Sequence, residues 1–126
     1  MRQIIFDTET TGLFHDKGDR IIEVGAVEVV NFMPTGETFQ SYIDPGRSVS
    51  EETIQITGIT DEMLVGQPRF EDPAVVDKLL DFIGDGEIVA HNAKFDEGFL
   101  NMELQKCGRR PIPHNRWIDS AAFARQ

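Results

Sequence analysis

The sequence predicts a mixed α/β domain in which helices flank a central β-sheet. Three stretches rich in β-branched and aromatic residues occupy the first 44 residues, and short turn-like segments join them, which is typical of antiparallel strands. After them, segments with helical spacing of apolar residues alternate with short apolar runs, which is typical of strand–helix–strand units. We therefore expect one domain over residues 1–126 and a five-stranded sheet, with three antiparallel strands followed by two parallel ones.

The three antiparallel strands are expected at residues 3–7, 20–30 and 38–44. The first, QIIFD, is apolar on both faces, which predicts a central position in the sheet. The second, RIIEVGAVEVV, is rich in β-branched residues, and the third, TFQSYID, alternates between polar and apolar residues. The segment NFMPTGE between the second and the third has the composition of a turn.

Helices and two further strands are expected in the rest of the chain. SVSE (48–51) resembles a capping box that opens a short helix, which TGIT (57–60) interrupts. A longer helix should begin at Asp72 as the N-cap and end at Gly84. EIVAH (87–91) and RWI (116–118) are predicted strands, and a helix from about Asp96 to Gly108 lies between them. Asp119 or Ser120 should cap a last helix, SAAFARQ.

Composition and charge limit the classes of protein to consider. No apolar run approaches the roughly 20 residues of a membrane span, and the N-terminus lacks a signal-peptide pattern. The single cysteine, Cys107, suits a reducing compartment, so we expect a cytoplasmic protein. The net charge of −10 argues against nucleic-acid binding by electrostatics alone. An acidic protein can still act on phosphates when metal ions lie between the two.

Two carboxylates stand at the end of the first predicted strand. Asp7 and Glu9 follow the apolar residues IIF, and a glycine turn comes after them. Residues i and i+2 of a strand point to the same face, about 7 Å apart, so both side chains can converge on one point. Oxygen ligands of this kind suit Mg²⁺ or Mn²⁺. An exposed strand end that carries two solvated acids would give the same pattern.

The stretch IVAHNAKFD (88–96) repeats this arrangement. An apolar strand end leads into a polar pair, His91 and Asn92, and then to Asp96 near a helix start. An aspartate there is also favoured as a helix cap, and a histidine such as His91 is often a hydrogen-bonded structural residue. Two acidic strand ends in one small α/β domain nevertheless favour a shared site.

The motifs FDTETTGL, RIIEVGAVEVVN, TGITDEML and HNAKFDEGFL, in this order, resemble those of the DEDD exonucleases (DEDDh type). The similarity is greatest to the DnaQ-like group, the epsilon proofreading subunits of bacterial DNA polymerase III. It implies a ribonuclease H-like fold and a metal-dependent 3′→5′ exonuclease that removes mononucleotides from DNA 3′ ends, single-stranded or mispaired. By this resemblance Asp7 and Glu9 match the first motif and Asp96 the second. They would be the catalytic residues and would hold two divalent cations, Mg²⁺ or Mn²⁺.

The resemblance also implies substrate contacts around the site. Asp7 and Glu9 would face the substrate, Leu13 matches a side chain that presses against the terminal bases, and Glu52 matches a substrate-contacting acid. Thr57 stands where relatives commonly carry a histidine, and threonine can donate a hydrogen bond but cannot stack. A core leucine at position 13 and a solvated helix residue at position 52 are the alternatives.

The family closes its site with a third motif, a histidine followed five residues later by an aspartate, on a helix. His91/Asp96 and His114/Asp119 have this spacing. The first pair belongs to the second motif, and the second lies in a proline-flanked connection. We therefore expect the chain to end before the third motif, with the C-terminal helices missing and residues 1–126 nearly inactive alone.

The implied partners are the polymerase III catalytic (alpha) subunit, bound through a C-terminal segment, and the theta subunit. Two alternatives to the proofreading exonuclease stay open. One is a related DEDDh nuclease that acts on RNA or short oligonucleotides. The other is a non-catalytic remnant that binds nucleic acid. A helix with the His-x₄-Asp pattern after Gln126 would favour the enzyme.

Overall fold

A five-stranded mixed sheet organises the structure, a computed structural model that describes residues 1–121. The strand order is β3-β2-β1-β4-β5. β1 pairs antiparallel with β2, and β2 with β3, whereas β1–β4 and β4–β5 are parallel. The predicted sheet of three antiparallel and two parallel strands is therefore confirmed. The strands are β1 (Arg2–Thr10), β2 (Ile21–Val30), β3 (Met33–Tyr42), β4 (Glu87–Ala90) and β5 (Trp117–Asp119).

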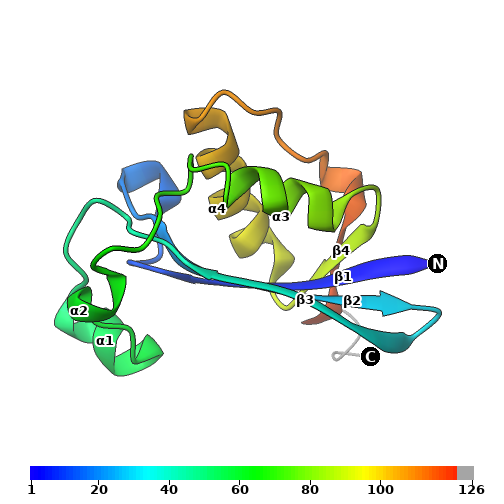
Figure 1. The fold of residues 1–126 in the computed structure, drawn as a ribbon, viewed down its shortest axis with the longest axis horizontal. Coiled ribbons are helices and arrows are strands. Elements are labelled where there is room, and N and C mark those ends of the chain that lie inside the picture. Colours follow the sequence, from blue (N-terminus) through cyan, green and yellow to red (C-terminus); the bar gives the residue numbers. More distant parts are fainter. Residues whose placement is uncertain (122–126) are drawn as a thin grey trace.

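Helices lie on both sides of this sheet (Figure 1). The longer pair, α3 and α4, covers one face, whereas the short pair, α1 and α2, lies toward the other side at one end of the sheet. The helices are α1 (Glu51–Thr57), α2 (Asp61–Leu64), α3 (Val76–Ile83) and α4 (Ala93–Lys106), with 3₁₀ turns η1 (His15–Lys17) and η2 (His114–Arg116). No helix in residues 1–121 has the length and apolar character needed to cross a membrane.

The main core lies between the sheet and the longer helix pair. Along β1, Ile4 and Phe6 point into this core and are almost fully buried, whereas Ile5 points to the opposite face and is 42% exposed. This alternation is the period of two expected for a strand. Trp117 of β5 packs edge-to-face on Phe6, with ring centroids 5.7 Å apart. The opposite face of β1 therefore carries Ile5, Asp7 and Glu9.

The connection between β2 and β3 is shorter than predicted. The expected turn over residues 31–37 is wrong, because only Asn31 and Phe32 form it and β3 already begins at Met33. Both turn residues have positive φ, 49° and 69°, as a two-residue type I′ hairpin requires. Pro34 is tolerated because β3 is an edge strand and the register with β2 is irregular there.

Three helix starts also differ from the prediction. Ser50 caps α1 by accepting from Thr53 N, so the expected capping box at residues 48–51 does not form. Asp72 opens a turn before α3, where its carboxylate accepts from Ala74 N at 2.9 Å, and α3 itself begins at Val76. Asn92, with φ 59°, leads the chain into α4 at Ala93, so Asp96 lies inside the first turn of α4.

The last predicted helix falls mostly beyond the region that the structure describes. Asp119 accepts a hydrogen bond from Ala121 N at 2.9 Å, as the residue before a helix commonly does. Residues 122–126 of SAAFARQ lie outside the described residues.

Candidate functional site

The candidate site forms where β1 continues beyond the end of its neighbour β4. β4 pairs with β1 only at Gln3, Ile4 and Ile5, so the later part of β1 has no strand on this edge. Asp7 and Glu9 belong to this later part, and their side chains point to the face opposite the main core. Asp7 is exposed and Glu9 is half-buried.

The first turn of α4 brings Asp96 to the same part of β1. Asp96 is buried, with 4% of its surface exposed. The hydroxyl of Thr8, which lies between Asp7 and Glu9 in β1, donates to Asp96 Oδ1 over 2.5 Å. This bond joins residues 88 positions apart. The end of β1 and the first turn of α4, the two segments that the sequence singled out, are therefore in contact.

Two of these carboxyl groups, Asp96 and Glu9, have raised pKa values. Burial, together with the negative charges of Asp7 and Glu9, raises the pKa of Asp96 to about 6, although hydrogen bonds from Thr8 oppose the shift. The pKa of Glu9 is also raised, first by burial and then by the charges of Asp7 and Glu23. Glu9 and Asp96 thus resist ionisation beside their acidic neighbours, and a cation bound there would relieve this repulsion.

The chemistry of these residues fits a hard divalent cation. The candidate ligands are all carboxylate oxygens, the donors that Mg²⁺ and Mn²⁺ prefer. Gly25 of β2 lies directly opposite Asp7, and a side chain there would meet no atom within 4 Å, so the space beside Asp7 is open. Within residues 1–121, however, no three acidic, histidine or cysteine side chains are close enough to surround one metal ion.

A cleft of about 380 Å³ adjoins Glu9 and Thr8 of β1. Among its lining residues are Glu9, Leu13, Glu52 and Thr57, all predicted to contact the substrate. Leu13 is 70% exposed, so the alternative of a core leucine is wrong. The Thr57 hydroxyl donates to Thr53 O at 2.9 Å and accepts from Ile59 N at 3.1 Å, so it is already engaged at the end of α1.

The sequence interpretation missed three apolar residues of the same cleft, namely Phe14, Ile56 and Phe95. Phe14 and Ile56 are 53% and 76% exposed, although both are large and apolar. Phe95 lies within the HNAKFD motif, and the other two are direct neighbours of Leu13 and Thr57. These three residues could therefore have been found from their positions next to the predicted substrate contacts or within the second motif. The cleft combines an acidic end with apolar walls.

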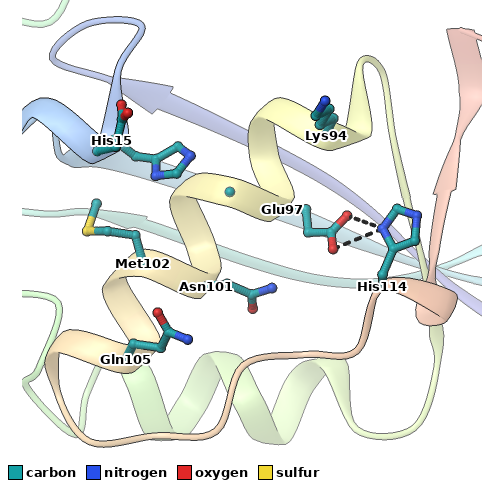
Figure 2. Close-up of a pocket in the computed structure, with 9 residues that line it drawn as sticks. His15, Lys94, Glu97, Asn101, Met102, Gln105 and His114 are labelled. Atoms are coloured by element: carbon teal, nitrogen blue, oxygen red, sulfur yellow. Dashed lines mark hydrogen bonds and ion pairs between the residues drawn. The ribbon is translucent and has the colours of Figure 1, made fainter.

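A second, larger cleft of about 710 Å³ runs along the outer side of α4. Figure 2 shows that His15, Lys94, Glu97 and His114 line it, and that His114 points toward Glu97. His114 Nδ1 lies 2.8 Å and 3.1 Å from the two Glu97 oxygens. Asp119 instead accepts hydrogen bonds from Asn92 N and Ala121 N. His114 and Asp119 therefore have separate partners, which does not favour them as a catalytic pair.

Comparison with solved structures supports the fold. Escherichia coli exonuclease I, in a metal-free complex with single-stranded DNA, matches with a TM-score of 0.84 over 98% of this chain and 29% of that chain, at 19% identity. Exonuclease X, in complex with 5′-overhanging duplex DNA, matches with a TM-score of 0.68 over 98% of this chain and 62% of that chain, at 26% identity. The sheet and its helices define a ribonuclease H-like domain.

Sequence comparison identifies the family to which the chain belongs. The family model described as Exonuclease (RNase_T) matches residues 4–126. The chain belongs to this exonuclease family.

Its curated relatives include two DNA polymerase III epsilon subunits. That of Salmonella typhimurium is 45% identical and that of Escherichia coli K12 is 44% identical, each over 99% of this chain and 54% of the relative. The chain thus spans about half the length of the curated relatives it matches.

Proposed function

We propose that this chain is the exonuclease domain of a 3′→5′ proofreading exonuclease of the epsilon type. It would remove mononucleotides one at a time from single-stranded or mispaired DNA 3′ ends. The observation that supports the proposal is the hydrogen bond from Thr8, which stands between Asp7 and Glu9, to Asp96, since it brings the two motifs together beside a cleft that Glu9 and Leu13 line. The likeness to the epsilon subunits supports DNA as the substrate.

Each residue of the site has a proposed role. Asp7, Glu9 and Asp96 would hold two divalent cations, Mg²⁺ or Mn²⁺, which when bound would activate the attacking water and stabilise the leaving oxygen. Thr8 orients Asp96 through its hydroxyl. Leu13, with Ile56 on the α1 side, offers apolar surface for the terminal base. Glu52 and Thr57 contribute polar atoms to the same cleft.

The apolar part of the cleft suits the end of a single strand. A paired base presents its flat faces to its neighbours in the stack, whereas an unpaired terminal base can place a face against a side chain. A mispaired 3′ end frays more readily than a paired one, so it would enter the cleft more often. The proposed preference for mispaired ends therefore follows from the need to separate the strands.

The test uses the purified gene product with a 5′-labelled primer that ends in a 3′ mispair. With Mg²⁺ we expect a ladder of products that shorten by one nucleotide at a time. Asp7→Ala should lower the rate by more than about 100-fold, because even the loss of an outer-shell partner of a metal costs about 10–100-fold. The exposed Asp81→Ala, on α3, is the matched control and should keep the wild-type rate.

Other outcomes would contradict the proposal. Internal cuts, or digestion from the 5′ end, would mean a different class of nuclease. Faster digestion of RNA of the same sequence would favour the related DEDDh nuclease, and binding without digestion would favour a binding module.

We further propose the polymerase III alpha subunit as partner and expect the two purified proteins to co-elute in size-exclusion chromatography. Separate elution would contradict this partner.

A further inference from the structure

The inference concerns the loop of residues 10–14, here called the cleft loop, which joins β1 to η1 and carries Leu13. We propose that Asp19 is a positioning residue that fixes the cleft loop, so that Leu13 is held ready to contact the terminal nucleobase. This role rests on the proposed exonuclease function. Asp19 does not line the cleft itself and would act only through the loop.

The carboxylate of Asp19 binds the cleft loop on both sides of Leu13. Its Oδ1 accepts from the Thr11 hydroxyl at 3.0 Å, and its Oδ2 accepts from Phe14 N at 3.1 Å. Arg47 lies 3.7 Å from Oδ1, and only 19% of the Asp19 side chain is exposed. One side chain therefore closes the loop across the residue that points into the cleft.

Gly12 makes this approach possible. A Cβ at Gly12 would lie 2.4 Å from Asp19 Oδ2 and 2.6 Å from its carboxyl carbon, closer than any real contact. The φ angle of Gly12 is not in the left-handed region, unlike that of Gly18. The glycine is therefore needed for the space that the carboxylate occupies and not for its backbone angle.

Three further backbone groups of the cleft loop, Thr11 N, Thr11 O and Gly12 O, are also bonded. Thr11 N donates to Arg20 O at 2.8 Å, and the Thr10 hydroxyl donates to Gly12 O at 2.6 Å. From α1, on the other wall of the cleft, the Thr53 hydroxyl donates to Thr11 O at 2.8 Å. The loop is thus tied to β2 and to α1 at once.

A loop so firmly fixed still leaves the Leu13 side chain 70% exposed. Ile56, which also lines the cleft, is 76% exposed. Exposed apolar side chains in a cleft are suited to the flat face of a base, and fixing them before binding lowers the entropy that binding must overcome. Loosening the loop should therefore weaken substrate binding more than it slows the chemical step.

The experiment compares variants of the purified gene product on a single-stranded DNA 3′ end. Asp19→Ala should raise KM by about tenfold, since it removes two hydrogen bonds to a charged group, while kcat changes by less than about threefold. It should also speed amide exchange at Leu13 and Phe14. Asp19→Asn, which keeps one acceptor oxygen, should fall in between. The exposed Asp16→Ala, in η1, is the control and should change neither quantity.

A double-mutant cycle tests the geometry directly. Gly12→Ala should raise KM as Asp19→Ala does, because the new methyl group displaces the carboxylate. The double variant should be no worse than Asp19→Ala, because the carboxylate that clashes with the methyl group is gone. Additive effects of the two changes on KM would overturn the proposed role of Asp19.

The outcomes separate this inference from the proposed function. Unchanged loop exchange in Asp19→Ala, or faster exchange with unchanged KM, would overturn the role of Asp19 and leave the exonuclease assignment standing. A wild-type protein that degrades no nucleic acid would overturn the proposed function, and with it the role of Asp19 toward the substrate.

Discussion

The surroundings of Asp96 are unfavourable to its ionised form in the metal-free protein. Asp96 is 4% exposed, and burial with the charges of Asp7 and Glu9 raises its pKa to about 6. Its ordinary pKa, 3.8, applies to the unfolded chain. Between these values the folded protein retains a proton that the unfolded chain has released. Stability should therefore fall as the pH rises from about 4 to about 6 and then level off.

Replacing Asp96 by asparagine should remove this penalty. We expect Asp96→Asn to raise the free energy of unfolding by about 2 kcal/mol at pH 7.5 in EDTA, and by much less at pH 4.5. The amide oxygen can still accept from the Thr8 hydroxyl. Urea denaturation at the two pH values measures the effect. An equal gain at both would show that ionisation of Asp96 is not its cause.

At the scale of single residues, the sequence predicted the acidic residues but not the hydrogen bond that Asp96 accepts from Thr8. The spacing of Asp7, Glu9 and Asp96 within recognisable motifs was sufficient to select them. Thr8 faces away from Asp7 and Glu9, as the alternation of a strand requires, and its hydroxyl binds Asp96. That contact spans 88 residues and depends on how α4 docks against β1, so no local pattern contains it.

A buried ion pair joins two elements, α4 and the start of β2. Glu103 is 1% exposed and accepts from Arg20 Nε and Nη2, and also from Ile21 N at 3.1 Å. Arg20 is in turn bonded to Thr11 of the cleft loop through both its backbone N and O. The pair therefore holds α4 against the start of β2, where Arg20 also binds the cleft loop.

Breaking this pair should cost much more than breaking an exposed one. Glu103→Ala leaves Arg20 and Ile21 N without their acceptor, so we expect a loss of about 3 kcal/mol in the free energy of unfolding. Asp77→Ala removes the partner of Arg109 in a pair that is about 40% exposed, and should cost less than about 1 kcal/mol. Similar losses for the two variants, measured by urea denaturation, would contradict this account.

Element existence and type followed from the sequence, whereas several element ends did not. The apolar spacing of Phe99, Leu100 and Leu104 predicted α4, and all three are buried. Glu103 shares that buried surface, and periodicity alone cannot reveal that Arg20 makes a carboxylate acceptable there. The start of α4 was misplaced because Asn92 adopts a left-handed conformation, which Asn allows but its sequence does not require.

For the molecule as a whole, metal binding should appear as stability. A cation that binds only the folded protein raises the free energy of unfolding by about 2.7 kcal/mol at 100 times its Kd. We expect Mn²⁺ to raise the melting temperature of the wild type but to have little effect on Asp7→Ala. Asp81→Ala should respond as the wild type does. An equal response from Asp7→Ala would remove Asp7 from the metal site.

The topology was predictable because short connections favour antiparallel neighbours and helical connections favour parallel ones. The order β3-β2-β1-β4-β5 follows once QIIFD is taken as the central strand. The shape of the cleft was not predictable in the same way. It depends on α1 lying opposite the cleft loop, through the Thr53–Thr11 hydrogen bond, and this placement has no signature in either segment.

The contact between Trp117 and Phe6 gives the sheet a built-in optical probe. Trp117 is the only tryptophan in the chain, it is 8% exposed, and its indole nitrogen has no hydrogen-bond partner among residues 1–121. Its fluorescence should therefore be that of an indole in apolar surroundings and should shift to longer wavelength when water reaches it. Because β5 is the outermost strand on the parallel side of the sheet, the emission of Trp117 reports whether β5 is packed against the rest.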